Sequence, residues 1–420
     1  MKKICLLLSL LIPLELFGQY GSDLEVFNIE NRAVRAYMPA AESYYSENHN
    51  YSNSIVSKYN NSQYGTKLHW PQGYDLKWSA TSPSSEISSF KITLTDESSQ
   101  SKASTYILDD PSLRSYTLYN MIPERIYTYK VEEFRTNGSV EIIKEGRFRT
   151  EGQVRMIRIP NCSNIRDIGG WSSQYGGRIR YGLLYRSGSL NRVTSEGRHE
   201  FVDNMGVRAE LDLRHEVNQS RSSLGSDIAY DRRRHEAGTK GLSQNKKDYA
   251  KDLRWIMDKL DKGICVDWHC AIGCDRCGAL SFLIEGLLGM DELDLSRDFE
   301  LSTFSLKHPN KRPRAHIKSM LDFIKKYGTL EDKSKEDYLA RCFFNYWKSI
   351  GLRDDELHKF IGIMLEDYDG GHKRQEVEMI DLPHEYEIKF NPVNSTPLEM
   401  PVLRSPISIS DPIPMPSSVK

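Results

Sequence analysis

The sequence predicts two folded domains in series, a β-sandwich followed by an α/β domain whose mostly parallel central sheet is flanked by helices. Its 420 residues, 39% of them hydrophobic, are enough for two separate cores. Short β-prone runs separated by turn residues fill residues 67–152. From residue 155 to residue 370, strand-like and helix-like runs alternate, which is typical of a parallel sheet covered by helices.

The first residues are typical of an exported protein. Lys2 and Lys3 precede a short apolar stretch that Pro13 interrupts, and the small residue Gly18 then leads into polar sequence. This order predicts a cleaved signal peptide over residues 1–18. A membrane anchor is the alternative, but the apolar run is short for a stable membrane span. We expect a periplasmic or extracellular protein.

Residues 19–66 are rich in Ser, Asn and Tyr and show little periodicity, so we expect a polar lead-in there. The β-prone runs of the next region have the spacing of a sandwich. They cover residues 74–79, 89–96, 104–110, 115–134 and 145–152.

A tryptophan and a late segment of this region point to a family. Trp78 lies in the first run, and the segment LYNMIPERIYTYKV contains Leu118, Pro123, Tyr127 and Tyr129. In these positions the region resembles a fibronectin type III domain. The resemblance implies a spacing or docking module that contacts a protein partner. Another small sandwich would serve the same role.

The α/β region shows a succession of helix and strand patterns. Thr194 and Ser195 can start a helix that ends at Gly206, and residues 207–214 then alternate like a strand. The further elements are a helix over 246–263, a buried strand over 264–268, a buried helix over 278–290, and three helices over Ala315–Tyr327, Glu336–Ile350 and Asp355–Tyr368. Residues 371–420 become polar and proline-rich, and we expect them to be disordered.

Charge and cysteine content exclude some classes of function. The chain carries 57 basic and 58 acidic residues, so no global charge attracts nucleic acid. Six cysteines remain after the predicted leader, too few for a disulfide scaffold in a chain of this length. Four of these six lie between Cys265 and Cys277.

The segment VDWHCAIGCDRCGALS, residues 266–281, holds the richest chemistry of the chain. It joins the end of a predicted buried strand to the start of a helix, where sites form in open α/β sheets. Five residues separate Cys270 from Arg276. Such a loop can turn its N–H groups toward an anion, while the helix N-terminus and the arginine favour a thiolate. The expected chemistry is attack on a phosphate ester through a cysteinyl-phosphate intermediate.

Several motifs then identify a family. The chain has HC-x5-R after a strand, together with NIRDIGG, LYRSGSL, ELDLRHEVN and RDFELST in this order. In these motifs, residues 155–365 resemble the bacterial tyrosine phosphatase branch with HCxxGKDRTG, which includes dual-specificity and phosphoinositide-active enzymes. The resemblance implies a phosphorylated protein, phospholipid or inositol phosphate as substrate, and no cofactor.

The resemblance also implies roles for residues of the segment. Cys270 is the nucleophile and Arg276 the phosphate clamp, and His269 orients the loop and tunes the thiol. The backbone donors to phosphate come from Ala271, Ile272, Gly273, Cys274 and Asp275.

Two aspartates match the general acid of the family. We rank Asp212, at the end of the predicted strand, narrowly above Asp275 in the loop. For Asp212 the alternative is an ion pair with Arg214 or Arg166, and for Asp275 it is a carboxylate that braces the loop. The motif NIRDIGG is expected to form a polar loop against the site through Arg166 and Asp167, or to have a purely structural role.

The chain departs from the family pattern at Cys274, where the branch has Lys, and at Cys277, where it has Thr. These changes remove a positive charge and a hydroxyl donor, and a thiol is a weaker donor. Two alternatives follow: a non-catalytic protein that binds phosphorylated ligands, and an inositol-phosphate phosphatase. A metal site is a further alternative, with Cys265, Cys270, Cys274, Cys277 and His269 as its ligands. Such a site would not explain the family motifs elsewhere in the chain, so we expect no metal.

Overall fold

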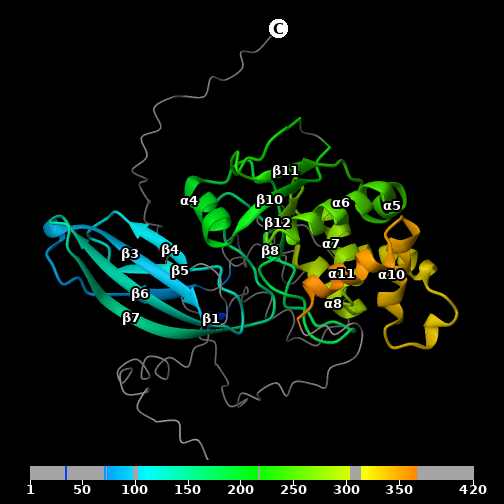
Figure 1. Ribbon diagram of the computed structural model, residues 1–420, viewed down its shortest axis with the longest axis horizontal. Helices are drawn as coiled ribbons and strands as arrows, with labels where there is room; N and C mark the ends of the chain where they lie inside the picture. Colours follow the sequence, from blue (N-terminus) through cyan, green and yellow to red (C-terminus); the bar gives the residue numbers. More distant parts are fainter. Residues whose placement is uncertain are drawn as a thin grey trace, which may run out of the picture.

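The computed structural model describes residues 71, 73–97, 103–215, 218–302 and 314–366, and the backbone strand at 34–35 (Figure 1). The predicted signal peptide, the tail from residue 371 and the rest of the predicted lead-in lie outside the described residues. None of the helices in the described ranges is long and apolar enough to cross a membrane.

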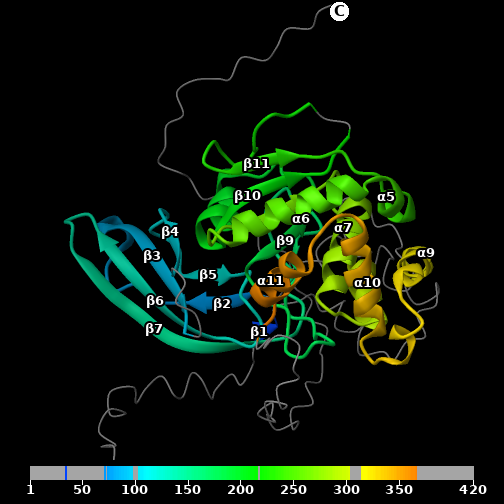
Figure 2. The ribbon, with the colours of Figure 1, turned by 45° about the vertical axis from the view of Figure 1, so that its right-hand side comes forward.

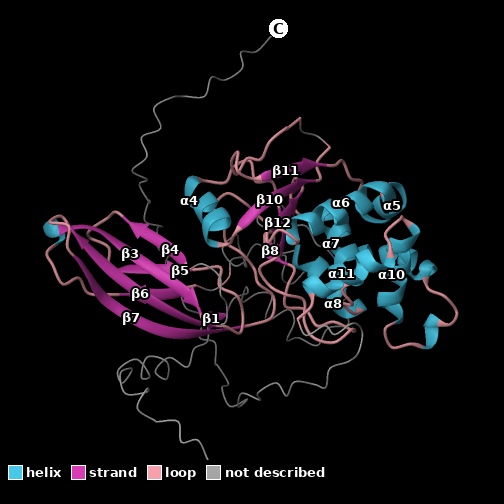
Figure 3. Ribbon diagram, viewed as in Figure 1, coloured by secondary structure: helices cyan, strands magenta, loops and turns pink. Residues whose placement is uncertain are grey.

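The N-terminal region consists of two β-sheets (Figure 3, magenta). One sheet has the strand order β1-β7-β6-β3-β4, and a second pairs β2 with β5. The strands are β1 (Val34–Arg35), β2 (Tyr74–Lys77), β3 (Ile87–Asp96), β4 (Ser104–Leu108), β5 (Ser115–Leu118), β6 (Ile126–Arg135) and β7 (Val140–Glu151). Every β-prone run predicted from the sequence contains a strand. All pairs are antiparallel except β1 with β7.

The two sheets share one hydrophobic core. Side chains of β6 alternate between buried and half-buried along the strand, as the period of two requires. Trp78 packs on Phe90 with ring centroids 5.4 Å apart, and Leu118 on β5 is fully buried in the same core. The core therefore joins both sheets, while the fibronectin type III assignment stays a prediction.

The second domain has a five-stranded sheet with the order β11-β10-β12-β9-β8. Its strands are β8 (Arg166–Asp167), β9 (Leu184–Ser187), β10 (Val207–Asp212), β11 (Ala229–Arg232) and β12 (Cys265–His269). The pairs β9–β12, β12–β10 and β10–β11 are parallel, and only β8 runs antiparallel at the edge. The predicted mixed α/β fold with a mostly parallel sheet is confirmed.

Helices flank this sheet, most of them on one face (Figures 1 and 2). They are α4 (Ser195–Arg198), the π-helix η4 (His199–Asn204), α5 (Gly238–Gln244), α6 (Lys246–Leu260), α7 (Asp275–Leu287), α8 (Glu292–Leu301), α9 (Arg314–Ile324), α10 (Tyr338–Ser349) and α11 (Asp354–Met364). Three short 3-10 helices are η3 (Ser84–Glu86), η6 (Lys325–Tyr327) and η7 (Asp332–Ser334). The predicted Thr194 cap is present, since its hydroxyl accepts from the N–H of Gly197 at 3.1 Å.

Buried hydrogen bonds connect the two domains. Asn120, between β5 and β6, donates to the carbonyl of Arg158 at 3.1 Å and to Glu200 at 2.8 Å. Arg155 donates to the carbonyl of Asn120 at 3.0 Å. At the edge strand β4, the N–H of Thr105 donates to Asn204 at 3.1 Å. The α/β domain thereby covers part of an edge that would otherwise be open to pairing.

Candidate active site

The candidate site lies at the carboxyl end of β12, where Cys270 opens a loop that leads into α7. We call residues 270–276 the cysteine loop. At Gly273 the loop lies close to the neighbouring strand β9. A Cβ added to Gly273 would lie 2.7 Å from the backbone of Ser187, and the φ of Gly273 is +70°. Only glycine fits this conformation and this approach. The helix N-terminus that follows supplies amide donors and positive potential for an anion.

The environment of Cys270 favours its thiolate. A hydrogen bond from the Cys277 side chain, backbone N–H groups and the charge of Arg276 lower its pKa to about 5 despite its burial. Burial and the adjacent Cys270 raise the pKa of Cys277, so Cys277 keeps its proton. Cys277 also lies 3.6 Å from the carbonyl of Ser187, but a thiolate is the stronger acceptor for its single proton. At neutral pH Cys270 is therefore mostly in the thiolate form, which is the nucleophilic form of a cysteine.

His269, which precedes Cys270 in the chain, is fully buried. Its Nε2 lies 2.9 Å from Oε1 of Glu210. Burial disfavours a charged imidazole, but the Glu210 hydrogen bond and charge outweigh burial and raise the pKa of His269. This contact fixes the ring, which agrees with the orienting role expected from the sequence. The role itself stays a prediction.

Arg276 is half-buried, and its Nη1 donates to the carbonyl of Leu213 at 3.3 Å. Leu213 is held in turn, since its N–H donates to the carbonyl of His269 at 2.9 Å. The structure thus brings together the cysteine loop and the residues that follow β10.

Asp212 is fully buried in a close ion pair with Arg214. Nε and Nη2 of Arg214 donate to its two oxygens at 2.8 and 2.7 Å, and the hydroxyl of Tyr230 adds a hydrogen bond at 2.9 Å. Burial raises the pKa of Asp212, but the hydrogen bonds and charges of Arg214, together with His269, lower it overall. A carboxylate held in this way is a poor proton donor. Asp275 is exposed in the first turn of α7. The two candidates therefore differ in exposure and in their hydrogen bonds, and the ranking of Asp212 above Asp275 stays a prediction.

A buried network supports the cysteine loop from beneath. Arg166 and Arg186 both donate to Asp298, at 2.7 and 2.8 Å. Arg186 also donates to the carbonyl of Gly273 at 2.9 Å, and Asn164 donates to that of Ile272 at 3.2 Å. The loop conformation is therefore fixed by side chains of distant segments.

This network explains part of what the motifs do. Arg166 of NIRDIGG supports the loop through its hydrogen bond to Asp298. Asp167 has another partner, since its Oδ2 accepts a hydrogen bond from Nη1 of Arg155 at 3.2 Å. Sequence reasoning left two buried charged residues unassigned: Arg186 of this network and Glu210, the partner of His269. The signal for both was a charged residue inside a strand-like run, in LYRSGSL and ELDLRHEVN.

Cys274 is 1% exposed, and its sulfur lies 3.4 Å from the side-chain amide of Asn164. All six described cysteines are free thiols. Within the described ranges, no group of three or more His, Cys, Asp or Glu side chains is arranged to hold a metal ion.

The class of the second domain is an α/β domain whose parallel sheet ends in a braced loop with an acidified cysteine before a helix, an arrangement that is able to take up an anion. Comparison with known families specifies it further. Residues 157–373, just over half of the chain, match the sequence model of the tyrosine phosphatase family. The chain belongs to this family.

Solved structures with a similar fold include Pseudomonas aeruginosa TpbA, with 13% identity and a TM-score of 0.27 over 43% of this chain and 97% of that one. The catalytic core of the PP-IP phosphatase SIW14 from Saccharomyces cerevisiae matches at 14% identity and a TM-score of 0.25, over 32% and 78% of the two chains. PTPMT1 in complex with PI(5)P matches at 13% identity and a TM-score of 0.24, over 40% and 92%. No curated protein matches the sequence.

Proposed function

We propose that this protein hydrolyses phosphate monoesters through a cysteinyl-phosphate intermediate on Cys270. The substrates are phosphotyrosine or another phosphoprotein, or a phosphoinositide. One observation carries the proposal: the hydrogen bond from Cys277, with the adjoining backbone donors and Arg276, lowers the pKa of Cys270 to about 5 at the start of a helix. Nucleophile and anion site coincide there.

The residues suit two successive displacements at phosphorus. In the first, the Cys270 thiolate forms a sulfur–phosphorus bond, and the phosphorus–oxygen bond to the leaving group breaks. In the second, water attacks phosphorus, the sulfur–phosphorus bond breaks and the thiolate is regenerated. Arg276 and the backbone N–H groups of the cysteine loop hold the phosphate oxygens. Cys277 donates its proton toward the sulfur as it leaves.

Asp275 is the proton donor in this proposal, and Asp212 is a positioning residue that fixes Arg214. The exposed carboxyl of Asp275 can protonate the leaving oxygen and then accept a proton from the attacking water. Asp275→Asn should slow esters with poor leaving groups by about a hundredfold and activated aryl phosphates far less. If Asp212→Asn shows this pattern and Asp275→Asn does not, Asp212 is the acid.

The nucleophile is tested with Cys270→Ser and a matched control, Cys342→Ser, which alters another buried thiol on α10. Release of phosphate from p-nitrophenyl phosphate and from phosphotyrosine peptides should vanish in Cys270→Ser and persist in Cys342→Ser. Unchanged turnover in Cys270→Ser would overturn the proposal.

A non-catalytic binding protein is the second candidate, because the Asp212 carboxylate is locked in its ion pair and cysteine replaces the family threonine. Wild-type protein that binds vanadate but releases no phosphate from any of these substrates would favour binding over catalysis.

A further inference from the structure

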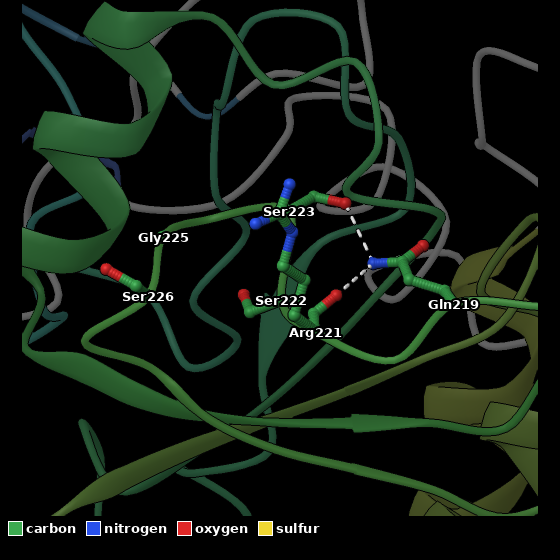
Figure 4. Close-up of a pocket in the computed structure, with 6 residues that line it drawn as sticks. All are labelled: Gln219, Arg221, Ser222, Ser223, Gly225 and Ser226. Atoms are coloured by element: carbon green, nitrogen blue, oxygen red, sulfur yellow. Dashed lines mark hydrogen bonds between the residues drawn. The ribbon is translucent and has the colours of Figure 1, made fainter. Parts of the chain in front are cut away.

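A pocket of about 470 Å³ lies in the loop between β10 and β11 (Figure 4). We call it the serine pocket. Its described lining residues are Gln219, Arg221, Ser222, Ser223, Gly225 and Ser226. All of them are polar or glycine, and none carries a carboxylate. A volume of this size matches small-molecule sites, which span roughly 300–1,000 Å³.

Internal hydrogen bonds shape the serine pocket. The side-chain amide of Gln219 donates to the carbonyl of Arg221 at 2.7 Å and to the hydroxyl of Ser223 at 3.0 Å (Figure 4). The hydroxyl of Ser222 donates to Glu210 beneath the pocket and accepts from the N–H of Leu224 at 2.9 Å. These hydrogen bonds fix the conformation of the loop, so the pocket is preorganised for a ligand.

The charge of the serine pocket suits an anion. Arg221 is exposed, and its guanidinium makes no hydrogen bond or ion pair with any residue in the described part of the chain. The nearby carboxylate of Asp227 is occupied by Arg198 at 3.0 Å. Glu210 below the pocket is occupied by Ser222 and by His269. The hydroxyl of Ser222 donates to Glu210 and that of Ser223 donates to Asn191 at 3.3 Å. Among the described lining residues, the guanidinium of Arg221 and the hydroxyl of Ser226 are therefore the donors that a phosphate can engage.

One side chain connects the serine pocket to the cysteine loop. Arg214 donates to Gln219 at 3.0 Å on the pocket side and to the hydroxyl of Ser189 at 3.0 Å on the other. The N–H of Ser189 donates in turn to the carbonyl of Ala271, at 3.3 Å. A chain of hydrogen bonds through Arg214 and Ser189 therefore connects the pocket wall at Gln219 with the cysteine loop.

We propose that the serine pocket binds a second phosphate group of the substrate while the first occupies the cysteine loop, with Arg221 as the specificity-determining residue. The preferred substrate is then a small molecule that carries two phosphate monoesters. This inference rests on the proposed function. The family resemblance leads us to expect a lysine in the cysteine loop at the position of Cys274. Arg221 supplies a positive charge that this substitution removes.

The test compares Arg221→Ala, Arg221→Lys and a matched control in the full-length protein. The control is Arg147→Ala, which removes an exposed arginine from β7 of the first domain. The substrates are p-nitrophenyl phosphate, an inositol monophosphate and an inositol bisphosphate. For the bisphosphate, Arg221→Ala should lower kcat/KM by about ten- to a hundredfold, mainly through KM, as expected for a lost charged hydrogen bond.

For p-nitrophenyl phosphate and the inositol monophosphate, kcat/KM of Arg221→Ala should stay within about twofold of wild type. For Arg147→Ala, kcat/KM should stay within about twofold of wild type on all three substrates. Arg221→Lys should recover part of the loss, because lysine keeps the charge without the planar fork. An equal loss on mono- and bisphosphates, or no loss on a bisphosphate in either its soluble or its vesicle-bound form, would overturn the second phosphate site. In both cases Cys270-dependent turnover of p-nitrophenyl phosphate would leave the proposed function standing.

Two further arms identify the source of the second phosphate. Phosphatidylcholine vesicles that contain a phosphoinositide bisphosphate present the same chemistry as a lipid headgroup. A loss confined to the vesicles assigns the pocket to the headgroup, and a loss confined to soluble inositol bisphosphate assigns it to the free form. A loss seen only with a doubly phosphorylated peptide would contradict the small-molecule substrate.

Discussion

At the scale of single residues, the pair Cys270 and Cys277 distinguishes this site. Cys277 stands where the family resemblance leads us to expect threonine, and its side-chain hydrogen bond is the largest cause that lowers the pKa of Cys270. The sequence predicted the nucleophile and the loop, because both lie in one continuous segment. The ion pair with Arg214, given as the alternative for Asp212, is confirmed. The hydrogen bond from Tyr230 to the same carboxylate could not be predicted, because Tyr230 lies on another strand.

Cys277→Ala should raise the pKa of Cys270, because it removes that hydrogen bond. A higher pKa leaves less thiolate on the acidic side, so the acidic limb of kcat/KM should move to higher pH by about one unit. The rate of alkylation by iodoacetamide across pH measures the shift directly. Cys277→Ser, which keeps a donor, should stay closer to wild type. Equal alkylation profiles for wild type and Cys277→Ala would show that the hydrogen bond does not set the pKa.

The same pair predicts a response to peroxide. Peroxide oxidises the Cys270 thiolate to a sulfenic acid, and the Cys277 thiol can then attack that sulfur, form a disulfide and release water. Cys274 is a less suitable partner, since its sulfur lies against Asn164 and the carbonyl of Ile272. Peptide mapping after brief peroxide treatment should find a Cys270–Cys277 link that a dithiol reverses. Irreversibly oxidised Cys270 without a link to either neighbour would contradict this expectation.

At the scale of elements, periodicity was enough for several long helices and strands, but it missed the ten-residue helix α8 and the short strands. Helices α6, α9, α10 and α11 were predicted from their apolar spacing, and the strands β10 and β12 from their alternation or burial. The strands β1 and β8 have two residues each, too few for any period. In β9 the buried Arg186 interrupts the apolar pattern. Its partner Asp298 lies on α8, far along the chain, so no local pattern predicts the pair.

Asp298→Asn tests whether the network beneath the loop holds the site in place. It leaves the guanidinium groups of Arg166 and Arg186 buried without their carboxylate. We expect the free energy of unfolding to fall by about 3–5 kcal/mol, measured by urea denaturation. Asp322→Asn, at an exposed acid of α9 that pairs with Lys318, is the control and should change it by about 1 kcal/mol at most. A change of the same size in both variants would show that the network adds no more than a surface contact.

At the scale of the whole molecule, the order of the two domains followed from composition and pattern, but the way they join did not. The joint depends on Asn120, whose backbone has φ +64 and whose side chain is buried between the domains. It bonds Glu200 and receives bonds from Arg155 and from the N–H of Arg158. Contacts of this kind between residues far apart in sequence leave no local pattern.

Asn120→Ala should weaken the joint, because alanine loses the side-chain bonds and tolerates a positive φ poorly. We expect a loss of about 2–4 kcal/mol in unfolding free energy and a calorimetric transition that splits in two. The control is Asn137→Ala, in the turn between β6 and β7, where the amide oxygen only accepts from Ser139. A single unchanged transition in Asn120→Ala would mean that the domains do not depend on this residue.

The Asn120 joint has a consequence for how the protein meets its substrates. The first domain extends to one side of the α/β domain, away from the helices α5 and α10 (Figures 1 and 2). If a partner holds that domain, the buried bonds at Asn120 pass its orientation on to the cysteine loop. The opening of the site would then face one direction at a constant distance from the partner. Proximity and angle, in addition to chemical affinity, would decide which phosphate groups are reached.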